Sequence, residues 1–138
     1  MQQTISFVTL GVAKLQRSRD FYKALGWQES SASQDQVAFF QVGSMAFALF
    51  GRESLAEDAN VSAMGSGFPG FALAHNVATE IDVDATLNEA VGRLVRPAEK
   101  APWGGFRGYF ADPDGFLWEV CFNPFLTLDE RGFVKLPD

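Results

Sequence analysis

Two similar blocks of sequence pattern follow one another along this chain, and that repeat restricts the fold more than any other feature. In each block a strand pattern is followed by a helix pattern and then by further strand patterns. Residues 53–69 separate the blocks and are rich in small, polar and Gly residues. Because each block is one supersecondary unit, the repeat predicts two equivalent modules in an α+β protein.

The first block predicts one helix and several strands. Residues 4–12 are rich in β-branched and aromatic side chains, which favours a strand. Residues 14–26 carry apolar side chains at helical spacing and end at a Gly that can stop a helix. Further strands are expected at 27–33, where polar residues alternate, at 36–43 and at 45–52, followed by one helical turn at 55–59.

The second block predicts the same order of elements. Its strands are expected at 70–77, 105–111 and 116–122, and its helix at 81–94 with Val91 and Leu94 on the apolar face. Residues 95–103 contain two prolines and are expected to form an edge strand or a long turn. Asp112-Pro113-Asp114-Gly115 predicts a tight turn between the last two strands, because Asp bonds local N–H groups and Gly supplies a positive φ. A short hairpin is expected around residues 130–132.

The length of 138 residues suits one domain with its own core. We therefore expect a single domain over residues 1–138, divided into module one (1–52), a linker (53–69), module two (70–124) and a C-terminal tail (125–138).

Charge and composition exclude several classes of partner. The net charge is −6 and no basic cluster is present, so no nucleic-acid partner is expected. Cys121 is the only cysteine, which excludes an intrachain disulfide and a CxxC metal site. No apolar run approaches the ~20 residues of a membrane span, and the first residues lack the features of a signal peptide. We expect a cytoplasmic protein with no membrane partner.

Two motifs resemble the vicinal oxygen chelate superfamily, which holds glyoxalase I, extradiol dioxygenases, and bleomycin- and fosfomycin-resistance proteins. They are LGVAKLQRSRDFYKALGW at residues 10–27 and GYFADPDGFLWEV at residues 108–120. The resemblance extends to about Pro124. It implies paired βαβββ modules whose strands form an open, U-shaped mixed sheet around a pocket for a small-molecule ligand. It also implies a homodimer.

In the metal-bearing members of that superfamily, four positions facing the pocket supply ligands. By the resemblance these positions are Phe7 in the first strand, Ala48 in the last strand of module one, Gly70 (or Phe71) at the opening of module two, and Glu119 in the final strand. The metal in such members stabilises charge that develops on two neighbouring substrate oxygens. Only Glu119 could donate to a metal here.

His75 is the only histidine, so one chain cannot supply the two imidazoles that the family's sites use, and a symmetric dimer still averages one per site. Residues alternate faces along a strand, so His75 points away from the pocket if Gly70 points into it. We therefore predict a structural role for His75 and a metal-free protein with no cofactor. A divalent site of carboxylates and water remains an alternative, although no second carboxylate facing the pocket is evident.

Small and aromatic residues predict a partly apolar ligand pocket. Plain core packing is the alternative explanation for each of them. The residues expected to line the pocket are Phe7, Thr9, Ala48, Phe50, Gly70, Ala72, Trp103, Arg107 and Tyr109.

Glu119 has two interpretations. Strand alternation puts it on the face away from the large aromatic residues, where burial should raise the pKa of its carboxyl and make it a general base or a ligand acceptor. The alternative is an inherited carboxylate that is paired with an arginine such as Arg107. Cys121 shares the face of Glu119, but no suitably placed base is evident that would activate its thiol.

Three classes of function follow. The first is a metal-free protein that binds a partly apolar small molecule, and the second is a lyase- or isomerase-type enzyme that uses Glu119 as general base or remnant metal ligand. The third is a structural dimer with a filled pocket. Glyoxalase chemistry is disfavoured, because in the family that the chain resembles it needs the metal.

Overall fold

The computed structural model describes residues 3, 5–69, 71–90 and 93–136, and it confirms a mixed α+β fold. The chain divides into two compact units, Met1–Gly67 (unit one) and Phe68–Asp138 (unit two). No helix among the described residues is long and apolar enough to cross a membrane.

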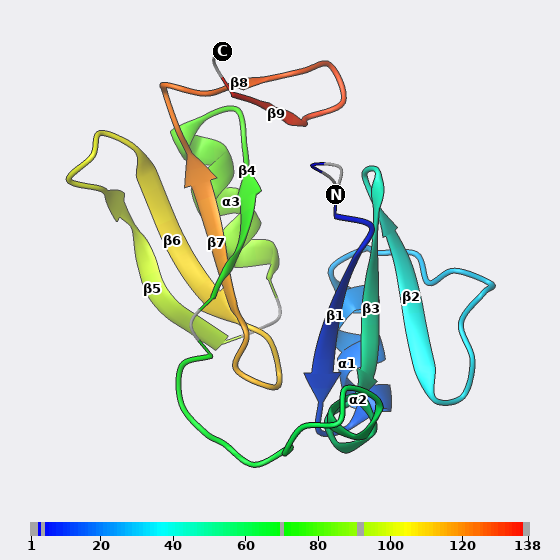
Figure 1. Cartoon of the computed structure of the whole chain (residues 1–138). Coiled ribbons are helices and arrows are strands. Elements are labelled where there is room, and N and C mark those ends of the chain that lie inside the picture. Colours follow the sequence, from blue (N-terminus) through cyan, green and yellow to red (C-terminus); the bar gives the residue numbers. More distant parts are fainter. Residues whose placement is uncertain (1–2, 4, 70, 91–92, 137–138) are drawn as a thin grey trace. The chain divides into compact units, whose positions relative to one another are not determined.

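Unit one contains a three-stranded sheet with the strand order β1-β3-β2 (Figure 1). Its elements are β1 (Phe7–Val12), α1 (Leu15–Ala24), β2 (Val37–Val42), β3 (Met45–Gly51) and α2 (Arg52–Asp58). The first strand is parallel to β3, whereas β2 is antiparallel to it. The elements expected from the sequence at 4–12, 14–26, 36–43 and 45–52 are thus confirmed, with shifted ends.

Aromatic and aliphatic side chains between α1 and the sheet form the core of unit one. The ring of Tyr22 on α1 lies 4.9 Å from that of Phe47 and 6.1 Å from that of Phe40, measured between centroids. Leu10 and Leu49 share this core and are almost fully buried. Alternation along each strand therefore directs the odd-numbered residues of β1 to the other face of the sheet.

The strand expected at residues 27–33 is not formed, because only one isolated bridge joins Glu29 to Phe40. The carboxylate of Glu29 instead forms ion pairs with two residues of α1: it lies 2.9 Å from Lys23 Nζ and 3.4 Å from Arg19 Nε. Burial alone would raise the pKa of Glu29, but the hydrogen bond from Lys23 and the charge of Arg19 hold that pKa below its usual value. The ion pairs of Glu29 and single hydrogen bonds, such as that from Ser30 N–H to the Phe39 carbonyl (2.8 Å), hold this segment in place of a regular ladder.

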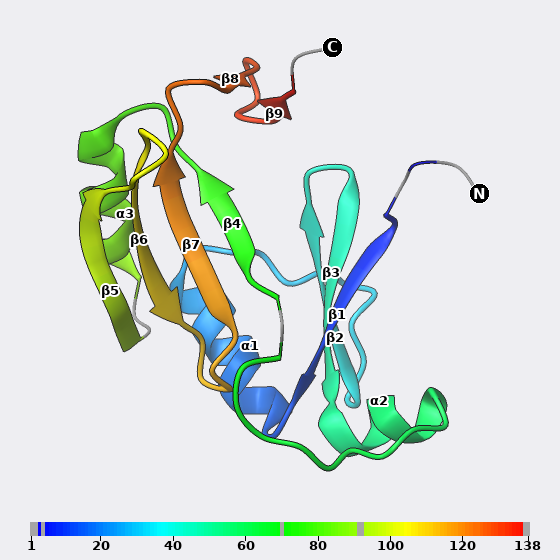
Figure 2. The same ribbon diagram turned by 60° about the vertical axis from the view of Figure 1, so that its left-hand side comes forward.

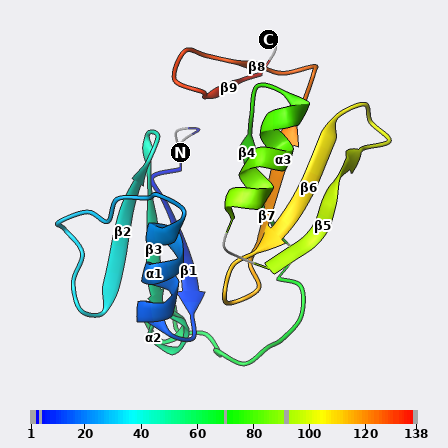
Figure 3. The same ribbon diagram turned by 180° about the vertical axis from the view of Figure 1, so that it is seen from behind.

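Unit two contains a four-stranded sheet with the order β4-β7-β6-β5, and α3 lies across one of its faces (Figures 2 and 3). Its elements are β4 (Leu73–Asn76), α3 (Glu80–Glu89), β5 (Arg93–Lys100), β6 (Phe106–Ala111), β7 (Leu117–Phe122), β8 (Thr127–Leu128) and β9 (Val134–Lys135). The strand that comes first in the sequence of this sheet, β4, lies beside the one that comes last, β7, and is parallel to it, as β1 is to β3 in unit one. The strands β8 and β9 form the short hairpin expected in the tail.

The helix expected at 81–94 ends earlier, at Glu89, because Ala90 is already extended (φ −65°, ψ 116°). Leu94 is therefore not on a helix face; it pairs with Phe110 in the sheet and is 54% exposed. Val91 lies outside the described residues. The strand β5 is irregular, with register shifts on either side of Arg96, and the second of these accommodates a proline.

Asp112 makes the predicted tight turn before β7. Its Oδ1 accepts hydrogen bonds from the N–H groups of Asp114 (3.0 Å) and Phe116 (2.9 Å). Gly115 adopts the positive φ of +86° that the turn requires. The turn fixes the register of β7 against β6, in which Glu119 lies opposite Tyr109.

Candidate functional site

The helix α3 covers one face of the sheet in unit two, and the functional candidates lie on the other face. A Cβ added to Gly108 would lie 2.5 Å from Leu87 Cδ1, so Gly108 faces α3 together with its cross-strand partner Val120. The next cross-strand pair, Tyr109 and Glu119, is directed to the opposite face. This agrees with the face that alternation predicts for Glu119.

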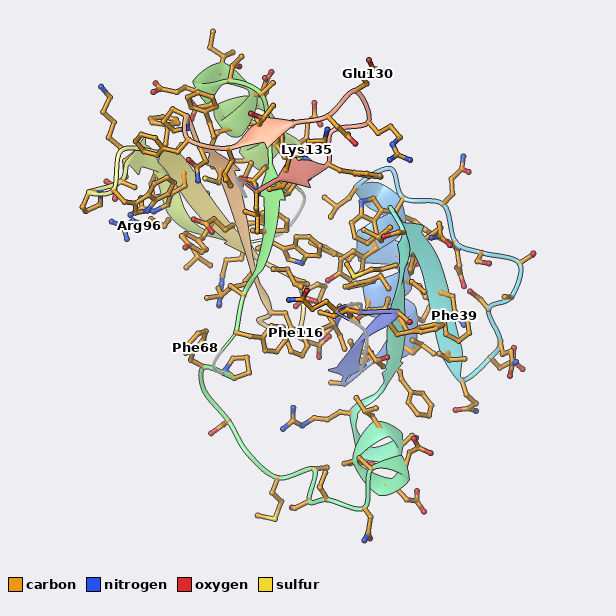
Figure 4. The ribbon with its side chains drawn as sticks, turned by 45° about the horizontal axis from the view of Figure 1, so that its top comes forward. Phe39, Phe68, Arg96, Phe116, Glu130 and Lys135 are labelled. Carbon is orange, nitrogen blue, oxygen red and sulfur yellow. The ribbon has the colours of Figure 1, made fainter. Side chains whose placement is uncertain are left out.

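The strand β5 adds two charged residues to that face. Arg96 lies opposite Tyr109, and Glu99 lies opposite Arg107. We call these four residues and Glu119 the polar face of unit two. Figure 4 labels Arg96 on this strand and, in unit one, Phe39 on β2.

One carboxylate on the polar face is shared by two guanidinium groups. Arg96 Nε donates to Glu99 Oε1 at 2.7 Å, and its Nη2 contacts the same oxygen. Arg107 Nη1 lies 3.4 Å from this oxygen. The hydrogen bond and charge of Arg96, followed by those of Arg107, hold the pKa of Glu99 below its usual value.

Tyr109 is coupled to Glu119. Burial, the negative charge of Glu119 and a hydrogen bond to its carboxylate raise the pKa of the Tyr109 hydroxyl above 10.0. The hydroxyl therefore stays protonated at neutral pH, opposite Glu119 on the neighbouring strand. Arg107, the arginine suggested as a partner of Glu119, forms its ion pair with Glu99 instead. No ion pair between Arg107 and Glu119 is found among the described residues.

Neither Cys121 nor His75 is placed as a reactive group. Burial, followed by the charge of Glu119, raises the pKa of the Cys121 thiol to about 11, so little thiolate forms at neutral pH. His75 pairs with Val120 and shares the face that α3 covers. His75 is exposed, but the protein atoms around its ring partly remove it from water and thereby lower the pKa of the imidazole.

In unit one, the predicted site residues lie on the sheet face away from α1. Thr9 pairs with Ala48, which pairs with Phe39, so all three share that face. The rings of Phe7 and Phe39 meet edge to face at 6.1 Å between centroids. The apolar face of unit one comprises Phe7, Thr9, Phe39, Ala48 and Phe50.

The remaining predicted site residues lie outside these two faces. Gly70 is not among the described residues, and Ala72 is exposed just before β4. Trp103 lies in the turn between β5 and β6, with 46% of the residue exposed. Its ring lies against Gly105, where an added Cβ would come within 1.9 Å of it.

A pocket of about 290 Å³ opens at the carboxyl ends of β4 and β7. The chain leading into β8 forms its other wall. The residues that line it are Asn76, Val77, Ala78, Phe122, Asn123, Leu126, Thr127 and Leu128. None of them was predicted, because the pocket depends on the path of the tail, for which the sequence carries no motif.

The residues at the four family positions do not fit a divalent metal. Phe7 packs against another ring, Ala48 is a buried residue without a donor atom, and Gly70 has no side chain. Glu119 is coupled to the hydroxyl of Tyr109. Within the described ranges, no three His, Cys, Asp or Glu residues gather in a way that could hold an ion.

Comparison with known proteins identifies the family. The model of the Glyoxalase/Bleomycin resistance protein/Dioxygenase superfamily matches residues 4–120. The chain is 35% identical to a glyoxalase-related enzyme from Fulvimarina pelagi, whose crystal structure it matches with a TM-score of 0.89 over 99% of this chain and 100% of that one. Comparison with curated proteins gives no match.

More distant solved structures share the fold. A glyoxalase/bleomycin resistance protein/dioxygenase family enzyme from Burkholderia phytofirmans is 19% identical, with a TM-score of 0.73 over 85% of this chain and 96% of that one. A lactoylglutathione lyase from Agrobacterium tumefaciens is 20% identical, with a TM-score of 0.68 over 89% of this chain and 96% of that one.

Proposed function

Because the chain belongs to the Glyoxalase/Bleomycin resistance protein/Dioxygenase superfamily, we propose that it binds a partly apolar small molecule without using a metal ion. One observation carries the proposal: Phe7 and Ala48, at two family donor positions, have side chains that cannot coordinate a cation. Phe7, which is 56% exposed, offers apolar surface to the carbon skeleton of an organic ligand instead.

The polar face supports the binding of a ligand that also carries polar groups. The carboxylate of Glu119 can accept a hydrogen bond from a ligand hydroxyl or ammonium group, and the Tyr109 hydroxyl can donate or accept one. Polar groups of this kind fix the orientation of the ligand in small-molecule sites. We also propose that the protein is a homodimer, which sedimentation velocity would test.

Metal analysis tests the central proposal. The purified chain is treated with EDTA, dialysed against Ni²⁺, Zn²⁺, Mn²⁺ or Fe²⁺ in turn, and its metal content is measured by mass spectrometry. The expected result is less than about 0.1 equivalent of any metal after desalting, because one carboxylate does not retain a divalent ion. One tightly held equivalent that disappears in a Glu119→Gln variant would overturn the proposal.

The coupling of Tyr109 with Glu119 favours a second function, that of a metal-free isomerase or lyase. In an isomerisation, Glu119 would take a proton from a substrate carbon and return it to a neighbouring atom, while Tyr109 would orient the carboxylate. Replacing Glu119 by Gln should then reduce turnover of the substrate by at least about 100-fold, the usual contribution of a general base. Undiminished turnover in that variant would exclude the mechanism.

A further inference from the structure

Arg107 is a buried cation whose one ion pair among the described residues is a long one. Its side chain is only 8% exposed, and the single bond that the described residues offer it is the one to Glu99 Oε1 at 3.4 Å. Bonds between N–H donors and oxygen are normally 2.7–3.2 Å long, and charge-assisted ones are shorter still. This contact is therefore a weak one for a guanidinium taken so far out of water.

The nearby carboxylates are engaged with other groups. Glu99 receives its shorter hydrogen bond from Arg96, and its side chain is 52% exposed, so water competes for it. Glu119 is coupled to the Tyr109 hydroxyl. Neither carboxylate meets Arg107 with the paired, parallel hydrogen bonds that a guanidinium can make.

The guanidinium of Arg107 has N–H groups beyond the one that contacts Glu99. None of its nitrogens is among the described side-chain atoms that are fully buried without a hydrogen-bond partner. Arg107 lies on the polar face, opposite Cys121 and on the same side of β6 as Tyr109. A ligand atom placed there could complete the hydrogen bonds of the guanidinium.

We infer that the small molecule bound by this protein is a partly apolar carboxylic acid whose carboxylate is held by Arg107. This inference rests on the proposed function and names the class of its ligand. A planar carboxylate matches the two-pronged geometry of a guanidinium. A phosphate dianion is disfavoured, because Glu99 and Glu119 would repel its second charge more strongly. The ring of Tyr109 would contact the carbon skeleton.

Matched acids and amides test the class of ligand. The full chain is titrated with phenylacetate, 4-phenylbutyrate and hexanoate, and with the corresponding neutral amides, while the signal of the Arg107 side-chain N–H is followed by NMR. At least one acid should bind saturably at up to 10 mM and at least about 10-fold more tightly than its amide, since a charge-assisted pair adds more than about 1.4 kcal/mol. The Arg107 signal should shift on addition of the acid and not of the amide.

Variants assign the effect to Arg107. Arg107→Gln should weaken acid binding at least about 10-fold and leave amide binding unchanged, and Arg107→Lys should weaken it less. Arg131→Gln is the matched control, because Arg131 is an exposed arginine of the tail hairpin in unit two and lies outside the polar face; it should change acid affinity less than about 3-fold. If Arg107→Gln does not fold, the acid–amide comparison on the wild type decides.

The outcomes separate this inference from the proposed function. Equal affinity for an acid and its amide, or unchanged acid binding in Arg107→Gln, overturns the carboxylate inference and leaves small-molecule binding standing. Absence of saturable binding by all three acids also overturns it. A tightly held metal ion, by contrast, overturns the proposed function itself.

Discussion

Replacing Gly108 by Ala tests how closely α3 and β5 pack around β6. The added Cβ would lie 2.5 Å from Leu87 Cδ1, 2.9 Å from the carbonyl oxygen of Arg96 and 3.0 Å from the backbone nitrogen of Ala98. The leucine methyl can rotate away, but the two backbone atoms belong to the irregular part of β5 and move only with the strand. We therefore expect Gly108→Ala to lower the free energy of unfolding, because a local rearrangement of side chains cannot relieve the two backbone contacts.

The size of that loss follows from two opposing effects. Overpacking of a close-packed interior typically costs about 1–3 kcal/mol. Replacing glycine also reduces the entropy of the unfolded chain, which returns about 0.4–1 kcal/mol. The net expectation for Gly108→Ala is a decrease of about 1–2 kcal/mol in the free energy of unfolding, measured by urea titration followed by circular dichroism.

Gly51→Ala is the matched control, because its added Cβ would meet Ser54 Oγ at an ordinary 3.5 Å, at a backbone φ of −55°. It should change the free energy of unfolding by less than about 1 kcal/mol. Adding Leu87→Ala to Gly108→Ala should restore little stability if the backbone contacts dominate. Equal stability of the Gly108→Ala and Gly51→Ala variants would refute the reasoning.

Three further predictions concern ionisable groups. Because the pKa of Cys121 is about 11, its thiol should react with iodoacetamide at pH 8 much more slowly in the folded chain than in urea; equal rates would contradict its burial. The pKa of Glu29 is lowered because the cations bound to its carboxylate outweigh the effect of burial. The ionised carboxylate therefore stabilises the fold at pH values above its ordinary pKa of 4.5, and this contribution is lost as the pH falls through the lowered pKa. The stability of Glu29→Gln, measured by thermal unfolding, should therefore fall less between pH 6 and pH 3 than that of the wild type, and parallel curves would show that Glu29 plays no part. Replacing Glu119 by Gln should lower the pKa of Tyr109 in an ultraviolet titration, since it removes a negative charge, whereas an unchanged curve would disprove their coupling.

Elements that carry their own local chemistry could be predicted from the sequence. The turn at 112–115 was predictable because its Asp and Gly residues act within four positions of one another. The helix end at Glu89 was not, because the apolar residue Leu94 continues a helical spacing while its backbone pairs with Phe110 in the sheet. Tertiary pairing here overrides a local pattern.

The site shows the same division between local and long-range information. Alternation along a regular strand places Arg107 and Tyr109 on one face, as the sequence predicts. Alternation fails in β5, where register shifts bring both Arg96 and Glu99 to that face although their numbers differ in parity. The partner of Arg107 could therefore not be read from the sequence: among the described residues its ion pair is with Glu99.

The parallel pairing of the first and last strands also bears on how each unit forms during synthesis. Leu73 pairs with Trp118, so β4 waits for about 45 further residues before its partner exists, which at ribosomal rates of 5–20 residues per second takes about 2–9 s. During this interval its edge is open to pairing with another chain. A strand of only four residues, two of which are His75 and Asn76, is a poor template for such pairing. The shortness of β4 thus protects the growing chain from aggregation before the sheet closes.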